Sequence, residues 1–437
     1  QAEINMREFD PRRFGNWATK DYTAAVSVAD YQHMYYCYKP AEQHEVGRDL
    51  RTSSVHETLK AHGAQLSQVF GWERARWYDA SGRGEKYSFR RSNWWDAVRA
   101  EALAVRERVG LMDLSTFSKF EVKGQGAFAF LDRICANKIP TRDGGIILGH
   151  LLNANGFVES EITVTRLGPE HFYVLSAAAA QLHDLDQLVW RRRPGETVDI
   201  IDVTDAYGTL VLAGPRSRDV LAACTAIDLS NVAFRWLTGK EAVVAGVRGV
   251  RLLRVNYVGE LGWELHCPMA DMPMVFDALM AAGQPQGIAL FGTYAMNSLR
   301  MEKAYRGWGS ELTAEIDMFE AAMERFIRLD KPDFIGRAAS LARKQRGART
   351  KLVYLAVDAT DCDCMGNEPV YSGDRLVGLT TSGGFGHAVQ KSLAFAYVDP
   401  SLATAGTGLD ILLFGDRRRA VILPEPAWDP RNERLRA

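Results

Sequence analysis

The pattern of strand-like and helix-like segments changes once along the chain, and this change limits the folds open to it. Before about Gly336, segments with helical spacing alternate with short strands. After it, short strands are separated by Gly and Asp turns, as in "TKLVYLAVDA", "EPVYSGDRLVGLTTSGGFG", "KSLAFAYVD" and "LDILLFGDRRRAVILPEP". The sequence therefore predicts a helix-and-strand region followed by a small β-barrel or sandwich.

The length of the chain, 437 residues, indicates more than one domain. The middle strands lack the long apolar runs of a buried parallel sheet, so we expect an α+β fold rather than a doubly wound one. We place a middle domain at residues 91–340 and a carboxy-terminal barrel at residues 350–437, with the basic linker "GRAASLARKQRGART" between them. Residues 1–90 are rich in aromatic and charged side chains with few periodic segments, so we expect an extended arm packed over the rest of the chain or over a partner.

Helical spacing predicts helices near residues 95–109, 125–139, 179–190, 271–282 and 292–304. The segment "VRLLRVNYVGELGWELHCP" reads as a hairpin, with Gly259 and Gly262 bracketing Glu260 and Leu261 at its turn. At such a turn we expect Glu260 to face solvent.

Several classes of function have no support in the sequence. The formal net charge is -1, so no basic field indicates nucleic acid as a partner. The longest apolar stretch is far shorter than the roughly 18–20 residues that cross a bilayer, and no signal-peptide pattern appears at the start. The nine histidines show no H-E-x-x-H spacing, and Cys362 and Cys364 form a lone C-x-C pair that we interpret as two incidental thiols in a loop. We therefore expect no metal site.

What remains is a set of carboxylates on strands and aromatic residues beside glycine turns, because the dinucleotide, P-loop and G-x-S-x-G motifs are also missing. In "GFVESEITVTR", residues 156–166, period-two alternation places Glu159 and Glu161 on the face opposite to Val158, Ile162 and their neighbours. Such groups suit a flat, nitrogen-rich ligand, since a carboxylate accepts paired N–H bonds and a ring stacks on the heterocycle. The alternative is a pair of surface glutamates on a half-exposed strand.

Seven segments occur in an order that resembles the tetrahydrofolate-binding aminomethyltransferase (glycine-cleavage T-protein) family. They are "VGLMDLSTFSKFEVKG", "NANGFVESEITVTRL", "LAGPRSRDVL", "NYVGELGWELHCP", "SLRMEKAYRGWGSELTAE", "DFIGRAA" and "TTSGGFGHAVQKSLAFAYV". Four earlier segments, "EFDPRRFG", "GRDLRTS", "FGWERARWYD" and "DAVRAEALAVRERVGLMD", resemble the carboxy-terminal half of dimethylglycine and sarcosine dehydrogenases. The resemblance implies three small α+β subdomains in a cloverleaf around a central hole, the third being the β-barrel.

The resemblance also implies an activity: tetrahydrofolate-dependent methylene transfer, coupled to oxidative demethylation of an N-methylated amine such as dimethylglycine or sarcosine. In the relatives a preceding flavin domain oxidises an N-methyl group to an iminium, and the folate half captures the one-carbon unit. Residues 1–90 would then be the tail of a flavin-dehydrogenase-type half, with FAD on an upstream domain or a separate subunit. We expect neither nucleic acid nor a membrane as a partner, and a location in the cytoplasm, or in the mitochondrial matrix of a eukaryote.

The resemblance assigns roles to four residues. Glu161 stands where relatives place an aspartate beside the folate amines, so its implied role is catalytic. Tyr257 and Glu264 match the family's folate-contacting tyrosine and glutamate, and Trp428 lies near the position of a terminal folate-contacting tyrosine. Glu159, on the same strand face as Glu161, is expected to be solvated.

Some T-proteins have an arginine at the position of Met296, where this chain differs. Arg300, on the same predicted helix, is then either a ligand for the folate tail or part of a structural salt bridge. Two alternative functions stay open. The chain could be a stand-alone tetrahydrofolate-dependent demethylase or methyltransferase, against which the arm argues, or a catalytically inactive folate-fold regulator, which the longer side chain at position 161 allows.

Overall fold

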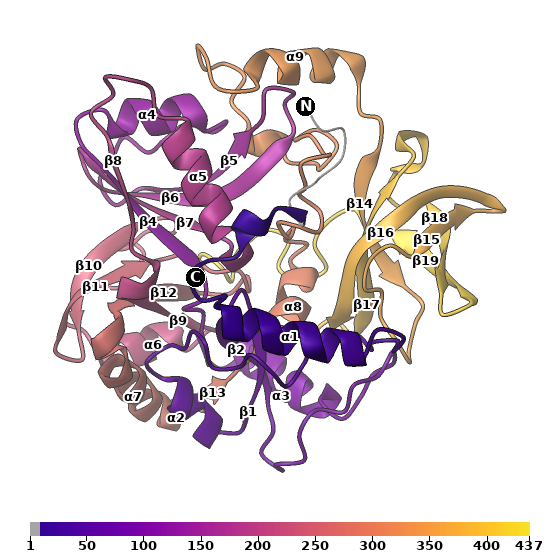
Figure 1. Ribbon diagram of the computed structural model, residues 1–437, viewed down its shortest axis with the longest axis horizontal. Coiled ribbons are helices and arrows are strands. Elements are labelled where there is room, and N and C mark those ends of the chain that lie inside the picture. The colour runs from indigo at the N-terminus through magenta and orange to yellow at the C-terminus, as the bar shows by residue number, and fades with distance from the viewer. Residues whose placement is uncertain (1–8) are drawn as a thin grey trace.

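The computed structural model describes residues 9–437, which form three lobes around a common centre (Figure 1). Two lobes are built on open sheets, with strand orders β10-β11-β12-β9-β3-β13 and β5-β6-β7-β4-β8, and the third is the closed barrel β14-β17-β16-β15-β18-β19. The predicted α+β fold of three subdomains with a carboxy-terminal β-barrel is confirmed. The motif "EFDPRRFG" begins at Glu8, which lies outside the described residues.

The first sheet packs against helices on both faces. Trp263 and Leu265 share an apolar cluster with residues of α6 and α7, whereas Val211 on the opposite face packs with α3 and α8. Because side chains alternate along β12, Glu264 and His266 lie on the face away from α6 and α7. The elements are β3 (Gly110–Asp113), β9 (Tyr207–Ala213), β10 (Gly239–Val244), β11 (Val247–Leu253), β12 (Gly262–Pro268), β13 (Ala289–Leu290), α3 (Trp95–Glu107), α6 (Ser217–Ala222), α7 (Met272–Gly283) and α8 (Thr293–Glu302).

The second sheet is covered on one face by α4 and α5 (Figure 1). The alternation predicted for β6 is confirmed: Ile162 and Val164 are buried under these helices, whereas Glu159 and Glu161 are partly exposed. Glu161 therefore points away from the helices. The elements are β4 (Ser118–Lys123), β5 (Ile146–Leu152), β6 (Val158–Gly168), β7 (His171–Ser176), β8 (Asp199–Asp202), α4 (Ala127–Ile134) and α5 (Gln181–Trp190).

The barrel is filled by aliphatic side chains such as Leu355 and Ile411 and is joined to the first lobe through α8. Ser298 Oγ donates to the carbonyl of Phe385 at 2.6 Å, next to further contacts between α8 and β16. The predicted basic linker contains a helix, α9 (Arg337–Arg346). The barrel strands are β14 (Lys351–Val357), β15 (Pro369–Ser372), β16 (Arg375–Gly386), β17 (Lys391–Val398), β18 (Gly408–Leu413) and β19 (Asp416–Ile422).

The predicted extended arm is wrong in its conformation, because residues 9–90 contain regular structure. These elements are α1 (Lys20–Gln32), α2 (His56–Ala61), β1 (Ala64–Val69) and β2 (Trp72–Tyr78). The hairpin buries Trp72 and Trp77 in place of aliphatic residues, so its apolar pattern is irregular in sequence. Arg51 ties the segment to the second lobe by donating to Gln181 Oε1 at 3.0 Å and to Asp205 at 2.6 Å. Across residues 9–437, no helix is both long and apolar enough to cross a membrane.

The connection between β11 and β12 is longer than the predicted two-residue turn. It runs from residue 254 to residue 261, and Leu253 pairs with Glu264 across the two strands. The prediction that Glu260 faces solvent is also wrong, because only 1% of its side chain is exposed. A glycine in the sequence indicates a turn but not whether the residues of the turn are buried. Here Glu260 points into the protein and pairs with Arg106 and Arg434.

Arg106 on α3 is the centre of this buried ionic network. Its guanidinium lies 3.1 Å from Glu260 and 2.8 Å from Glu302 on α8, and it donates to the Val258 carbonyl at 2.8 Å. Arg434, near the carboxyl end, approaches Glu260 to 3.0 Å. Burial raises the pKa of Glu260, and the charges of Arg106 and Arg434 oppose that rise. The network therefore fixes the β11–β12 connection against two helices.

Glu260→Ala is expected to destabilise the protein by about 3–5 kcal/mol, because it leaves part of the Arg106 charge buried without its partner. Urea unfolding measures the change. Glu241→Ala, at an exposed position of β10, is the control and should change the free energy of unfolding by no more than about 0.5 kcal/mol. Equal stability of the two variants would contradict a structural role for the network.

Candidate functional site

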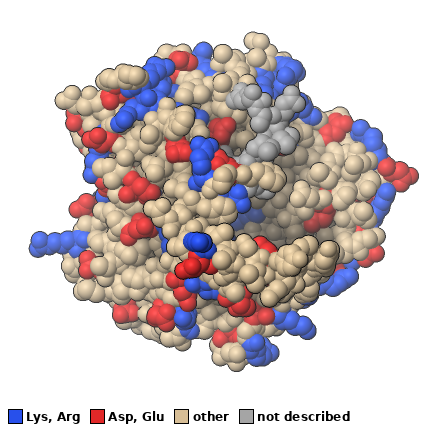
Figure 2. Space-filling model, in the orientation of Figure 1, with Lys and Arg blue, Asp and Glu red and all other residues tan. Residues whose placement is uncertain are grey.

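The carboxylate-bearing faces of β6 and β12 belong to sheets that meet between the first two lobes. Tyr173 Oη on β7 lies 3.1 Å from His266 Nδ1 on β12, and Arg251 on β11 pairs with Glu121 on β4. Figure 2 shows that the molecular surface is hollowed between the barrel and the other two lobes. The polar residues of both sheets therefore face the centre of the molecule.

Glu161 is held by its neighbour on the adjacent strand. His150 on β5 is directly opposite Glu161 in the antiparallel register, and its Nε2 lies 3.1 Å from Glu161 Oε2. His150 is fully buried, whereas 19% of the Glu161 side chain is exposed. Burial is the main cause of the raised pKa of Tyr257, and the charge of Glu161 adds to it. Glu161 and Tyr257 therefore lie close enough to interact electrostatically.

Glu159 has the same exposed fraction as Glu161, 19%, but different neighbours. Asn153 Nδ2 donates to its Oε1 at 3.0 Å, and His183 Nε2 lies 3.6 Å from its Oε2. The prediction that Glu159 is freely solvated is therefore wrong, because the β6 turn and α5 supply polar partners for it.

Glu264 has a carboxylate that is enclosed by protein and still reached by water. Burial raises its pKa to about 8, although the charge of Lys119 lowers it, and 13% of the side chain remains exposed. Lys119 is itself perturbed: burial lowers its pKa to about 7, and its Nζ donates to the carbonyls of Ser115 and Phe117 at 2.9 and 2.8 Å. The Glu264 carboxylate is therefore mostly enclosed and keeps a small accessible surface.

His266 is the polar neighbour of Glu264, with Nε2 lying 3.4 Å from Glu264 Oε2. Burial lowers the pKa of His266 far below its usual value, so the ring is neutral. Its Nδ1 lies 3.1 Å from the hydroxyls of both Tyr173 and Thr209. When these hydroxyls donate to Nδ1, the proton is on Nε2 and points to Glu264.

Tyr257 contributes an aromatic surface. Its ring stacks on that of Tyr305 with centroids 5.8 Å apart and planes 29° apart, and its hydroxyl donates to the Arg306 carbonyl at 2.6 Å. Because the hydroxyl proton is donated within the chain, Tyr257 can offer a ligand the face of its ring and an accepting phenol oxygen.

Trp428 belongs to the Arg106 network. Its Nε1 donates to Glu260 Oε1 at 2.8 Å, and its ring lies 4.9 Å from the Arg106 guanidinium and 5.0 Å from that of Arg434. Its backbone N–H donates to the Glu302 carbonyl at 3.0 Å.

Arg300 has the contacts of a structural salt bridge, the second of the two roles considered for it. It lies 3.4 Å from Glu311 and donates to Ser382 Oγ at 3.0 Å and Asn297 Oδ1 at 2.9 Å, which joins α8 to the barrel. Met296 packs in an apolar cluster on the same helix.

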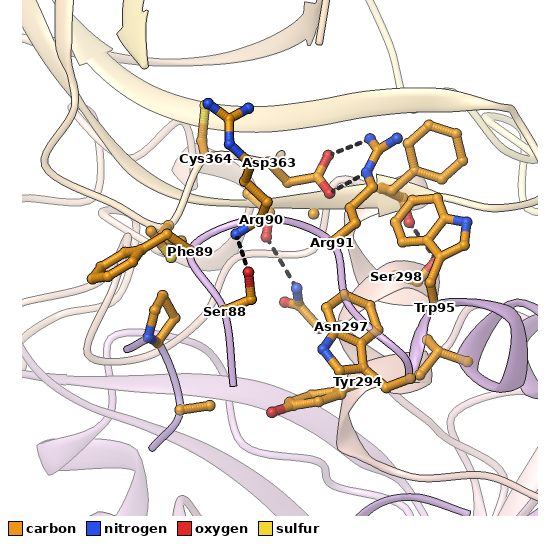
Figure 3. Close-up of a pocket in the computed structure, with 18 of the residues that line it drawn as sticks. Ser88, Phe89, Arg90, Arg91, Trp95, Tyr294, Asn297, Ser298, Asp363 and Cys364 are labelled. Atoms are coloured by element: carbon orange, nitrogen blue, oxygen red, sulfur yellow. Dashed lines mark hydrogen bonds and ion pairs between the residues drawn. The ribbon is translucent and has the colours of Figure 1, made fainter. Parts of the chain in front are cut away.

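Two cavities lie away from the predicted site residues. One, of about 220 Å³, is bounded by α3, α8 and the barrel (Figure 3). Figure 3 shows Arg91 pointing to Asp363. The two side chains are 3.0 Å apart, and the Arg91 guanidinium lies 4.1 Å from the Trp95 ring and 4.4 Å from that of Phe385. The other, of about 300 Å³, lies between the arm and α5. Neither is lined by the predicted site residues, so side-chain chemistry rather than cavity size identifies the candidate site.

Metal ligation has no support among residues 9–437, where no group of three or more His, Cys, Asp or Glu is placed to hold an ion. Cys362 and Cys364 are both buried, and burial raises the pKa of each thiol.

His150 and His266 were not among the residues predicted from the sequence. His266 follows Glu264 by two residues on a predicted strand, so strand periodicity was a sufficient signal for a shared face. His150 had no such signal, because its pairing with Glu161 depends on the register between two strands.

Glu264→Gln is expected to stabilise the ligand-free protein, increasingly so from about pH 6 to about pH 8. The pKa in the folded state, about 8, is above the ordinary value of 4.5. The folded state therefore binds the proton more tightly than the unfolded state, and stability falls as pH rises between these two values. Glutamine removes this loss, by about 1–3 kcal/mol after allowance for the exposed part of the side chain. Urea unfolding at both pH values measures it, and an equal pH dependence in both proteins would contradict the assignment.

Comparisons with known proteins agree with this architecture. The GCVT N-terminal domain family matches residues 55–331, the glycine cleavage T-protein C-terminal barrel domain matches residues 350–429, and the FAD dependent oxidoreductase central domain matches residues 1–53. The chain is 39% identical to mitochondrial dimethylglycine dehydrogenase of Mus musculus over 431 residues, which are 98% of this chain and 49% of that protein. It is 32% identical to an aminomethyltransferase of Saccharopolyspora erythraea over 367 residues, 84% of this chain and 94% of that protein.

The glycine cleavage system aminomethyltransferase T of Bartonella henselae has the same fold. Its crystal structure aligns with a TM-score of 0.76 at 22% identity and covers 87% of this chain and 98% of that one. The chain spans about half the length of the dimethylglycine dehydrogenase that it matches. The resemblance drawn from its motifs is thus confirmed, and the chain belongs to the glycine cleavage T-protein family.

Proposed function

We propose that this chain binds tetrahydrofolate and transfers to it the one-carbon unit released by oxidative demethylation of an N-methylated amine, such as dimethylglycine or sarcosine. The observation that supports this most directly is Glu264, an enclosed carboxylate whose pKa is raised by burial and whose partner is a neutral histidine. The names of the relatives, a dimethylglycine dehydrogenase and an aminomethyltransferase, supply the reaction class.

Glu264 fits the pterin end of tetrahydrofolate. Within residues 9–437, no lysine or arginine lies within ion-pairing distance of Glu264. A pterin presents a ring N–H beside an amino group, and this pair of donors matches the two oxygens of a carboxylate. Binding would therefore relieve the cost of burying Glu264 and lower its pKa. Tyr257 and Tyr305 offer a stacked aromatic surface to the same flat ligand.

Glu161 is proposed as the catalytic carboxylate. When bound, tetrahydrofolate supplies two amine nitrogens that take up the CH₂ of an iminium, with release of the demethylated amine and one proton. A carboxylate beside those nitrogens can accept that proton and stabilise positive charge. The hydrogen bond from His150 and the partial exposure of Glu161 keep the carboxylate available for this role.

The iminium donor is proposed to come from a flavin-bearing domain, fused or separate, that holds FAD. Residues 1–53 match the FAD dependent oxidoreductase central domain, and α1 within them buries only Ala29. Large exposed apolar side chains gather there, which is typical of a surface that another domain covers. They include Phe9 (72% exposed), Val28 (58%), Tyr31 (75%), Met34 (53%) and Tyr35 (98%).

In a eukaryote, we propose that this protein is located in the mitochondrial matrix, as the mitochondrial relative suggests.

The contribution of Trp428 to ligand binding and the domain boundaries at residues 90 and 340–350 stay predictions.

Tetrahydrofolate is expected to bind saturably, with Glu264→Ala weakening the affinity by about 2–3 kcal/mol, or about 30- to 150-fold. Because the carboxylate must be ionised to accept both N–H bonds, affinity should weaken below about pH 8, by at most about tenfold per pH unit. Titration followed by tryptophan fluorescence measures both effects, with Glu159→Ala as the control.

An unchanged affinity in Glu264→Ala would rule out the role of that residue. The lack of any saturable binding by the unmodified protein would instead favour the inactive regulator.

Glu161→Gln is expected to slow methylene transfer by about 10²- to 10⁴-fold, the usual contribution of a positioned acid or base, with a much smaller effect on affinity. Formation of 5,10-methylenetetrahydrofolate is measured with formaldehyde as the donor, above the rate without protein. Glu159→Gln is the matched control, since its carboxylate has the same 19% exposure on the same strand. Full activity in Glu161→Gln would show that the catalytic assignment is wrong.

A further inference from the structure

His150 has a partner for only one of its two ring nitrogens. Nε2 lies 3.1 Å from Glu161 Oε2, whereas Nδ1 is buried without a hydrogen-bond partner among residues 9–437. The side chain has no exposed surface. Buried polar atoms are nearly always satisfied, so a buried imidazole with an unsatisfied nitrogen calls for an explanation.

Packing and strand register, rather than Nδ1, hold the ring. His150 is directly opposite Glu161 in the β5–β6 pair, and its ring centroid lies 5.9 Å from that of Phe326, which ends the short helix η7 (Glu324–Phe326). The only hydrogen bond that the ring makes within the described structure is therefore directed at the carboxylate.

The position of the proton follows from this arrangement. A proton on Nδ1 would leave a buried donor unpaired, which costs more than an unpaired lone pair, and would also set the Nε2 lone pair against a carboxylate oxygen. A proton on Nε2 avoids both penalties and makes a charge-assisted hydrogen bond. Of the two tautomers, the geometry therefore assigns to His150 the one with the proton on Nε2.

We propose that His150 is a positioning residue that fixes the Glu161 carboxylate for methylene transfer; this inference rests on the proposed function. A glutamate side chain has three torsions, and a partly exposed one samples several rotamers. The hydrogen bond from the opposite strand selects one of them. Because small displacements of a reacting group lower rates strongly, a freed carboxylate is a weaker catalyst even where tetrahydrofolate still binds.

The contrast with Glu159 supports a specific role. Its histidine, His183, lies farther away, at 3.6 Å, and 21% of that side chain is exposed. Two carboxylates with equal exposure on one strand thus have histidine neighbours of different kinds: His150 is fully buried and 3.1 Å away, whereas His183 is partly exposed and 3.6 Å away.

Transfer rates and tetrahydrofolate affinities of His150→Gln and His150→Asn test the proposal, because the glutamine amide reaches the position of Nε2 and the asparagine amide does not. His150→Asn is expected to slow transfer by about 10- to 100-fold with affinity changed less than about threefold, and His150→Gln to retain most of the rate. In a Glu161→Gln background, His150→Asn should cause no further loss. Equal rates in the two variants, or an additive loss in that background, would overturn the proposal.

A measurement without folate gives an independent readout. Nitrogen-15 NMR of histidine-labelled protein is expected to show the proton of His150 on Nε2, and Glu161→Gln should shift that resonance. A proton on Nδ1 would overturn the assignment. If tetrahydrofolate does not bind the unmodified protein, the proposed function fails; if it binds and Glu161→Gln loses transfer while His150→Asn does not, only the role of His150 fails.

Discussion

The β11–β12 connection, which carries Tyr257 of the candidate site, is held in place by the buried charge of Arg106. This side chain joins α3 to Glu302 on α8 and to both Glu260 and the Val258 carbonyl on the β11–β12 connection. Val258 is the next residue after Tyr257, so the same guanidinium that holds two helices together also fixes the backbone beside the proposed aromatic surface. Hydrogen bonds from a guanidinium have a preferred geometry, whereas apolar packing does not. The eight-residue connection has no regular structure, so these hydrogen bonds hold its backbone, and with it the Tyr257 side chain, in one conformation.

Two carboxylates at this centre differ in environment, and this difference supports the separate roles proposed for them. Glu264 is enclosed, its pKa is raised to about 8, and its ionised form is stabilised when donors arrive. Glu161 already accepts a hydrogen bond and keeps 19% of its surface exposed. Acid and base roles on one fold are commonly set by such differences rather than by residue type. The first environment suits recognition of a ligand with paired N–H groups, and the second suits exchange of a proton.

Sequence alone predicted the parts of the fold that depend on local periodicity. The alternation along β6 placed Glu161 on the partly exposed face, and the short strands after Gly336 predicted the barrel. What failed depends on contacts between distant segments. Glu260 is buried in ion pairs with Arg106 and Arg434, which are distant from it in the sequence. The arm contains a hairpin that buries two tryptophans, and its apolar residues follow no simple period. The partner of Glu161 depends on the register between β5 and β6. The hydrophobic pattern of a strand does not determine this register where both of its faces carry polar residues.

The glutamate at position 161 does not by itself indicate an inactive protein. Its extra methylene, relative to an aspartate, adds a torsion, but the buried His150 on the opposite strand receives the longer side chain with a 3.1 Å contact. Glu264 is a second reason to expect an active protein. Its enclosed carboxylate, with a pKa raised to about 8, lowers the stability of the ligand-free protein at neutral pH. A scaffold that used only its outer surface would be more stable with an apolar or amide side chain at that position. A ligand that donates to Glu264 would offset this cost, which is a reason to expect the proposed binding role rather than a purely structural one.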